Sequence, residues 1–302
     1  MQDYLHFFLY FCTMFVATIG FFDGVHRGHL CLIEQVRALA RARGEASMIV
    51  TMDRHPREVV NPEMLPRLLT SREERIAMLR ASGVDRVHVL RFDEAMSRLS
   101  AREFMMMLSK DLSVDVLVMG YDHHFGHDGG AFEDYVGWGR ECCIDVVLAH
   151  RLEGEKASST ICRRLLAEGD VCGAQRLLGH EYTITGRVVA GRRIGRQLGF
   201  PTANIQVEGN KLLPKDGVYA CRVREFGSSG FRDSWRGILN IGIRPTLDNG
   251  NDRSVEVHII GHPGDLYGQM LQLQLLRRIR GERRFGNLDE LKAQIKSDID
   301  SL

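Results

Sequence analysis

The sequence predicts two domains: a doubly wound α/β domain over residues 1–178, and a small antiparallel β-barrel with a C-terminal helix over residues 179–302. A chain of 302 residues exceeds what one hydrophobic core usually organises. In the first half, short β-rich runs alternate with helical patterns, which is typical of a parallel sheet with crossover helices. In the second half, strand-like runs follow one another between Gly, Pro and Asn turns, which is typical of an antiparallel barrel.

The predicted parallel sheet consists of five runs: MFVATIGFF, ASMIVT, RVHVLRF, VDVLVMG and IDVVLAH. Two capping boxes mark helix starts, Ser71 with Glu74 and Ser100 with Glu103. A helical connector over residues 158–178 ends the first domain, with a predicted break at Gly169. We expect this connector to be rigid.

The predicted barrel strands begin near residue 181 and are EYTITGRVV, GVYACRVRE, WRGILNIGI, SVEVHIIG and MLQLQLL. FGSSG is a predicted hairpin tip. One helix, NLDELKAQIKSDI, follows the last strand.

Composition limits the class of partner. A net charge of +1 gives no global electrostatic reason to expect nucleic acid or an anionic membrane. The seven cysteines show no CxxC pair and no zinc-site spacing, so we expect reduced thiols and a cytoplasmic protein. The apolar start MQDYLHFFLYFCTMFVA lacks a basic n-region. We interpret it mainly as the extended first strand, and leave open that the first dozen residues are a leader or an inaccurate start. No other segment approaches the roughly 18 apolar residues of a membrane span.

The stretch GFFDGVHRGH, residues 20–29, lies between the first predicted strand and a helix. Ligands of open parallel sheets bind at such places, where helix N-termini offer backbone amides to phosphate. Gly20, Gly24 and Gly28 allow close backbone approach. His26 and His29 lie about one helical turn apart and can donate hydrogen bonds to phosphoryl oxygens. The alternative is an ordinary tight strand-to-helix turn.

This stretch resembles the HxGH signature of the nucleotidyltransferase superfamily, and Ser158, Ser159, Thr160 and Arg163 match its SSTxxR signature. With His55, Pro56 and GYDHHFGHDGG, the extended motif resembles the prokaryotic FAD synthetase group. The resemblance implies a Rossmann-like domain that transfers AMP from ATP to FMN, releasing FAD and pyrophosphate. It implies catalytic roles for His26, His29 and Arg163, and a flavin side formed by His55, Pro56 and Asp122. It implies ATP binding by Gly20, Phe22, Asp23, Gly24, Gly28, Ser158, Ser159 and Thr160.

The sequence departs from this family at His123 and His124, where an aromatic residue and an arginine are common. Loss of the guanidinium weakens bidentate phosphate contact, although a histidine can donate one bond. A histidine-rich metal loop is the less favoured alternative, because acidic or cysteine partners at recognised spacing are missing.

The second half lacks the P-loop motif and contains GRQLGFPTANI instead. Thr202 and Asn204 supply oxygen ligands that suit Mg²⁺ on nucleotide phosphates, and Pro201 fixes the chain. Gly191, Gly195 and Gly199 keep this loop close to its ligand. Alternatively, PTAN is a plain turn with a capping threonine.

From Gly186 onward the chain resembles riboflavin kinase, on the motifs GRxLGFPTAN, DGVYA, NIGIRPT, VEVHI, DLYG and IRGERRF. The resemblance implies that Glu256 is the general base toward the terminal ribityl hydroxyl. We expect Glu256 to point away from the face of its neighbours Val255 and Val257. Arg244 and Thr246 resemble flap residues, and Arg280 is expected at the flavin or nucleotide end. The clusters RRIR and GERR are interpreted as a solvated barrel edge rather than a nucleic-acid site.

Together the resemblances predict a bifunctional enzyme that phosphorylates riboflavin to FMN and then adenylates FMN to FAD, using ATP and Mg²⁺. Small molecules are the expected partners, without nucleic acid or membrane. The oligomeric state stays open. Two alternatives remain: a chain with one working half, and a flavin-binding regulator that has lost catalysis.

Overall fold

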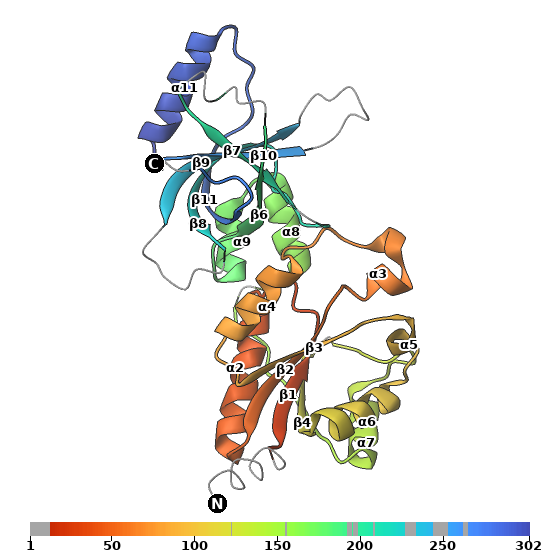
Figure 1. Cartoon of the computed structure of the whole chain (residues 1–302). Helices are drawn as coiled ribbons and strands as arrows, with labels where there is room; N and C mark the ends of the chain where they lie inside the picture. The colour runs from red at the N-terminus through yellow and green to blue at the C-terminus, as the bar shows by residue number, and fades with distance from the viewer. Residues whose placement is uncertain are drawn as a thin grey trace, which may run out of the picture. The chain divides into compact units, whose positions relative to one another are not determined.

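The computed structural model describes residues 13–121, 123–154, 156–191, 195, 199–207, 209–226, 234–243, 253–261 and 265–302. The chain forms two compact units (Figure 1). Unit 1 comprises Met1–Pro66 and Arg72–Lys156, and unit 2 comprises Arg67–Ser71 and Ala157–Leu302. The connector 158–178 therefore packs with the second unit.

Unit 1 contains a five-stranded parallel sheet. Its strands are β1 (Phe15–Ile19), β2 (Ala46–Met52), β3 (Arg86–Leu90), β4 (Val114–Met119) and β5 (Asp145–Leu148), in the order β3-β2-β1-β4-β5. All five match predicted runs, so the predicted α/β class is confirmed. The strand order reverses between β1 and β4, and open sheets bind ligands at such a point.

Helices cover both faces of this sheet. They are α2 (Arg27–Arg43), α4 (Arg72–Ala81), α6 (Ala101–Leu112) and α7 (Phe132–Glu141), with short α3 (Arg57–Val60), η1 (Pro62–Met64) and α5 (Glu94–Ser97). Successive residues of β1 alternate between faces: Ala17 joins the core formed with α6 and α7, and Val16 joins the core formed with α2. The predicted capping box at Ser100 and Glu103 is present at the start of α6.

Unit 2 begins with two helices, α8 (Ser159–Glu168) and α9 (Val171–Leu178). They break at Gly169, which has a φ of 89° and ends α8 in the left-handed conformation, as predicted. Cys162, Leu166 and Leu177 of these helices belong to the same hydrophobic cluster as the barrel interior. The connector is thus a packed part of unit 2.

The barrel closes in the order β10-β7-β6-β11-β8-β9. Its strands are β6 (Thr183–Val189), β7 (Thr202–Gln206), β8 (Gly217–Glu225), β9 (Trp235–Ile243), β10 (Arg253–Ile259) and β11 (Met270–Arg280). Five match predicted runs, and the barrel with its C-terminal helix α11 (Leu288–Asp300) is confirmed. The sixth, β7, was missed, because PTAN was interpreted only as a turn or ligand loop. Four residues of the predicted hairpin tip, 227–230, lie outside the described residues.

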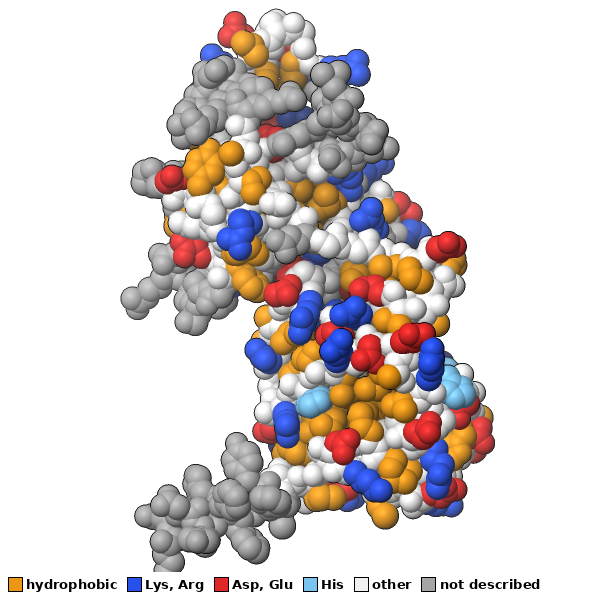
Figure 2. Space-filling model, turned by 45° about the vertical axis from the view of Figure 1, so that its right-hand side comes forward, with side chains coloured by type: hydrophobic (Ala, Val, Ile, Leu, Met, Phe, Trp, Pro, Cys, Tyr) orange, Lys and Arg blue, Asp and Glu red, His pale blue; other side chains and the backbone are white. Residues whose placement is uncertain are grey.

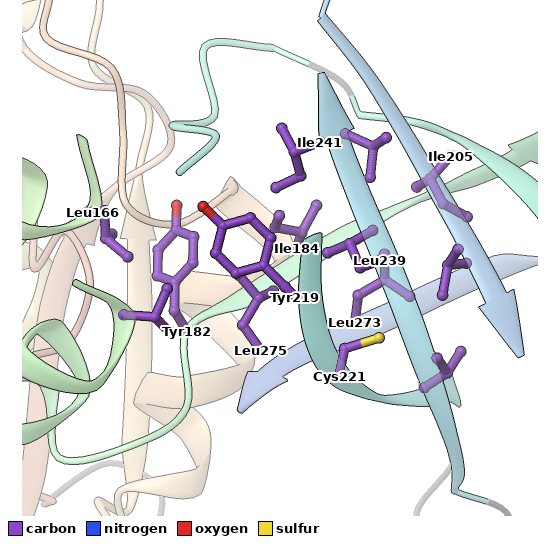
Figure 3. Packing of buried hydrophobic residues seen from close by; sticks show 14 of the residues in the cluster. Leu166, Tyr182, Ile184, Ile205, Tyr219, Cys221, Leu239, Ile241, Leu273 and Leu275 are labelled. Carbon is purple, nitrogen blue, oxygen red and sulfur yellow. The ribbon is translucent and has the colours of Figure 1, made fainter. Parts of the chain in front are cut away.

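Alternation along the strands separates the barrel interior from an outer face. Figure 3 shows the interior, where Tyr219, Cys221, Leu239 and Ile241 pack together. Residues between them in sequence, such as Asn240, point to the outer face. No helix in the part of the chain that the structure describes is long and apolar enough to cross a bilayer.

Candidate active sites

The turn of the first site joins β1 to α2 and is tied to the neighbouring strand. The Gly20 amide donates to the Val50 carbonyl (3.1 Å), and the Thr51 hydroxyl donates to the Phe21 carbonyl (3.3 Å). Three residues of the turn have positive φ: Phe22 (58°), Gly24 (81°) and Val25 (39°). A left-handed conformation at two non-glycine residues is strained, and such strain persists where the surrounding structure fixes the backbone. The turn is therefore held in one shape.

The two histidines of the motif lie against each other at the start of α2. Their rings stack with centroids 3.6 Å apart and planes 15° apart. His26 is the N-cap residue, and its Nδ1 accepts a hydrogen bond from the His29 backbone amide (3.3 Å). Because Nδ1 accepts, a neutral His26 carries its proton on Nε2 and can donate it to a ligand.

Burial lowers the pKa of His29 well below its ordinary value, and the charges of His26 and His123 lower it further. His29 is therefore a neutral imidazole near pH 7. Its Nδ1 is buried and has no hydrogen-bond partner among the described residues. A neutral imidazole with a spare ring nitrogen can serve a ligand as one hydrogen-bond partner.

A buried arginine of α4 supports the same turn. Arg75 is 1% exposed, donates through Nη2 to the Met52 carbonyl (2.6 Å), and places Cζ 3.9 Å from the centroid of the Phe21 ring. Burial lowers its pKa to about 10, which the nearby Asp23 carboxylate opposes, so the guanidinium stays charged near pH 7. The Phe21 ring also meets the His55 ring edge-on at 4.7 Å. Arg75 was not predicted, because a helical arginine in a sequence suggests a solvated face.

The predicted flavin-side residues follow β2. Pro56 is the N-cap of α3, and His55 Nδ1 accepts from the Arg57 amide (3.1 Å). His55 thus lies beside the turn through its contact with Phe21. Asp122 lies outside the described residues.

The loop after β4 carries the two histidines that depart from the family pattern. The charge of His123 lowers the pKa of His29, so the two rings are near enough for their charges to interact. The exposed His124 pairs through Nδ1 with the Gly130 carbonyl (3.1 Å). Within the described residues, no group of three or more His, Cys, Asp or Glu side chains could hold a metal ion. This gives no support to the metal-loop alternative.

The SSTxxR residues belong to unit 2 and are described with it. Ser158 is the N-cap of α8, and its hydroxyl accepts from the Ile161 amide (3.3 Å). Ser159 and Thr160 form the first turn of the helix. Arg163 donates through Nε to the Arg67 carbonyl (2.8 Å).

The second site is built on the outer face of the barrel. In the strand register Glu256 of β10 pairs with Asn204 of β7 on one side and Asn240 of β9 on the other. Directly paired residues share a face about 5 Å apart, so the carboxylate lies between two amides. Val255 and Val257 are buried inside the barrel, while Glu256 is half-buried on the opposite face, as expected.

Two predicted glycines pack against the predicted metal ligands. A Cβ on Gly191 would collide with the Asn204 amide, and a Cβ on Gly195 would collide with the Phe200 carbonyl and reach within 3.1 Å of Thr202 Oγ1. Gly199 has a φ of 84°, and the adjacent Pro201 carbonyl pairs with His258 Nδ1 at 2.8 Å. The loop therefore packs closely against Thr202 and Asn204, the predicted oxygen ligands.

These residues open into a cavity of about 630 Å³ between the outer barrel face and the C-terminal segment. Its polar lining includes Thr202, Asn240, Glu256 and His258. Its apolar wall comprises Phe200, Val218, Ile238, Phe285, Leu291 and Ile295. Gly195, Arg280, Glu282, Arg283, Arg284 and Asp298 complete the lining.

The structure brings the predicted Gly195, Thr202, Glu256 and Arg280 into one cavity, and adds residues that were not predicted. Asn240 and His258 could have been found by extending the alternation of their strands outward. Nothing in the sequence indicated that Asp298 lines a cavity, because it occurs in an ordinary helical pattern. Arg283 and Arg284 are exposed, as expected of a solvated edge, but they also line the cavity. Arg244 and Thr246 lie outside the described residues.

Comparison with family models divides the chain in the same way as the two folds. The FAD synthetase model matches residues 12–161, and the riboflavin kinase model matches residues 178–302. A solved structure named as a macrolide-efflux protein from Streptococcus pneumoniae superposes with a TM-score of 0.84 and 30% identity. It covers 96% of this chain and 93% of its own, so the two-part fold is shared.

Curated relatives extend over nearly the whole chain. The bifunctional riboflavin kinase/FMN adenylyltransferase of Pseudomonas fluorescens is 39% identical, and that of Escherichia coli K12 is 38% identical. The Bacillus subtilis protein of the same description is 31% identical. Each alignment covers 94% of this chain and 90% of the relative. This chain therefore belongs to the bifunctional riboflavin kinase/FMN adenylyltransferase family.

Proposed function

We propose that this chain makes FAD from riboflavin in two ATP-dependent steps, the first in the unit 2 cavity and the second at the unit 1 turn. The observation that carries the proposal is Glu256, paired with Asn204 and Asn240 in the strand register, in the wall of a partly apolar cavity that Asn240 also lines. A carboxylate between two amides can accept a hydroxyl proton, while the apolar wall suits a flat ring system.

In the first step, Glu256 accepts the proton of the terminal ribityl hydroxyl. The freed oxygen attacks the γ-phosphorus of ATP, and the bond to the bridging oxygen of ADP breaks. The apolar wall packs against the isoalloxazine rings and excludes water from the attacking oxygen. Arg244 and Thr246 are proposed as flap residues of this site, and Gly191, Gly195, Gly199 and Pro201 as its ATP loop.

Thr202 and Asn204 are proposed to hold Mg²⁺. Both offer neutral oxygen donors, which suit this hard cation, and Gly191 and Gly195 pack against them without a Cβ that would collide. Bound Mg²⁺ would offset the charge of the triphosphate.

In the second step, a phosphate oxygen of FMN attacks the α-phosphorus of ATP and pyrophosphate leaves. His26, through Nε2–H, and neutral His29 are proposed to donate hydrogen bonds to the phosphoryl oxygens. The amides of the turn at Gly20, Phe22, Asp23, Gly24 and Gly28 are proposed to bind ATP with Ser158, Ser159, Thr160 and Arg163. His55, Pro56 and Asp122 are proposed on the flavin side.

The test incubates the purified chain with riboflavin, ATP and Mg²⁺, and separates products by chromatography. We expect FMN to appear first and FAD to replace it. The presence of His123 and His124 favours one alternative, a chain with a working kinase half only, for which FMN would be the end point. A flavin-binding regulator would yield neither product.

We also propose that the protein works in the cytoplasm with small molecules as its partners. The six described cysteines are all free, which suits a reducing compartment. On the face that Figure 2 shows, basic side chains are interspersed with acidic ones instead of forming a single field. Cell fractionation with an antibody to the chain would test the compartment.

A further inference from the structure

We propose that Asp298, on the C-terminal helix α11, is a positioning residue that fixes Arg280 in the cavity wall and thereby sets the affinity for riboflavin. The inference rests on the proposed kinase function of this cavity. It assigns to Asp298 a role that its sequence context does not suggest.

The Asp298 carboxylate is 3% exposed and accepts hydrogen bonds from one edge of the Arg280 guanidinium. Arg280 donates through Nε to both carboxylate oxygens (3.1 and 3.0 Å) and through Nη2 to Oδ2 (2.8 Å). Gln294 donates to Oδ1 at 2.9 Å. A buried carboxylate is costly unless it is paired and hydrogen-bonded, and both conditions hold here. Because both oxygens have donors, Asp298 affects a ligand mainly through Arg280.

The guanidinium keeps donors for a ligand. Nε and one N–H of Nη2 go to Asp298, and Nη1 donates to the Gly281 carbonyl (3.2 Å). A guanidinium has five N–H groups, so one remains on each terminal nitrogen. The bidentate pair with Asp298 fixes the direction in which these two groups point.

Arg280 lies at a distance from Glu256 that suits the ring system of riboflavin. The strand register places Glu256, Asn240, Val218 and Arg280 in one row across β10, β9, β8 and β11. Three strand spacings measure roughly 14 Å along the sheet. Riboflavin carries its ribityl chain on N10 of the central ring and two carbonyls on the pyrimidine ring. With the terminal ribityl hydroxyl at Glu256 and the pyrimidine ring directed along this row, its carbonyls are the acceptors that we assign to Arg280. The centroid of the Phe285 ring lies 5.7 Å from Arg280 Cζ and 5.2 Å from Arg283 Cζ.

The test compares Asp298→Asn with Arg280→Gln and with the double variant. Asparagine keeps the size of Asp298 and removes its charge, so Arg280 loses its fixed orientation. We expect the riboflavin Kd, from quenching of flavin fluorescence, to rise roughly tenfold in each single variant, with kcat for FMN formation changed less than about twofold. The double variant should bind no more weakly than Arg280→Gln alone, because Asp298 acts through Arg280.

The matched control is Asp300→Asn, an exposed aspartate on the same helix, which should bind riboflavin like the parent. Fluorescence of Trp235 on β9, followed in a Trp138→Phe background, reports whether the barrel of each variant is folded. An unchanged Kd in Asp298→Asn, or losses that multiply in the double variant, would overturn the inference. If the parent binds riboflavin but forms no FMN, the kinase proposal fails, and the Kd comparison still tests the role of Asp298.

Discussion

The two candidate sites differ in how the chain builds them. The candidate unit 1 site takes its two histidines and its turn from one contiguous stretch, residues 20–29, in which Phe22 and Val25 have strained backbone conformations. The unit 2 site gathers single side chains from five strands, which meet through strand register, and from a helix that packs beside them. The first site therefore depends on backbone shape, and the second depends on side chains that can be exchanged one at a time.

Glu256→Gln should have the largest effect, because it removes the proposed base and keeps the size of the side chain. We expect FMN formation to fall by roughly 10²- to 10⁴-fold. FAD formation from supplied FMN should stay at the parent rate, since Glu256 is not part of the proposed adenylation site. The rates are measured by chromatography of the flavin products. Unchanged FMN formation would contradict the proposed mechanism.

His29→Ala tests the first site in the opposite direction. The variant loses one proposed donor to the phosphoryl oxygens, so FAD formation should fall by roughly 10²- to 10³-fold. FMN formation from riboflavin serves as the internal control and should be spared. An equal loss of both activities would show that the two sites are not separate.

Gly24→Ala tests how far the first site depends on backbone shape. A side chain at a φ of 81° is disfavoured by about 1 kcal/mol, and the turn should shift to relieve it. We expect FAD formation to fall roughly tenfold, with a lower urea midpoint by circular dichroism. The control is Gly137→Ala on α7, where a Cβ meets open space, and which should match or exceed the parent stability. Parent-like behaviour of Gly24→Ala would show that the turn is adaptable.

The smallest expected effect is a pH dependence of unit 1 stability. His29 is neutral when folded, whereas an unfolded histidine binds a proton below about pH 6.5. The unfolded state therefore binds more protons as pH falls from 6.5, and the free energy of unfolding should drop by about 1 kcal/mol per pH unit. Stability from this group is complete above pH 6.5 and decreases below it.

Urea melts can follow unit 1 alone. The chain has two tryptophans, so Trp235→Phe leaves Trp138 of α7 as the fluorescent reporter. In that background, His29→Gln should reduce the fall in the free energy of unfolding between pH 6.5 and 5. His124→Gln, which changes an exposed ring, should leave that fall unchanged. If the free energy of unfolding of His29→Gln fell as steeply as that of the parent, the pH dependence would come from other groups.

The fold could be predicted because both halves follow simple periodicities. Continuous β-rich runs gave all five parallel strands, and alternation gave five of the six barrel strands. The exception, β7, is only five residues long and reads Thr-Ala-Asn-Ile-Gln, so its polar residues suggested a loop. Pairing with β6 and β10 on both sides makes it a strand, and single-sequence patterns do not contain that information.

The candidate sites were predictable to the extent that they are local. His26, His29, Thr202 and Glu256 occur in short motifs, whereas Arg75 and Asp298 occur in ordinary helical patterns. Their importance arises from tertiary contacts: Arg75 is buried beneath Phe21, and Asp298 meets Arg280 eighteen positions away in sequence. No spacing rule links such pairs before the fold is known.

Residues of strand β10 alternate between two faces: Val255 and Val257 pack in the barrel interior, and Glu256 and His258 line the cavity. Mutations at the even-numbered positions can therefore change substrate choice. The unchanged residues at the odd-numbered positions preserve thermostability. A laboratory selection for kinases of altered flavin analogues could therefore randomise His258 and keep Glu256, because the residues that keep the barrel folded would remain untouched.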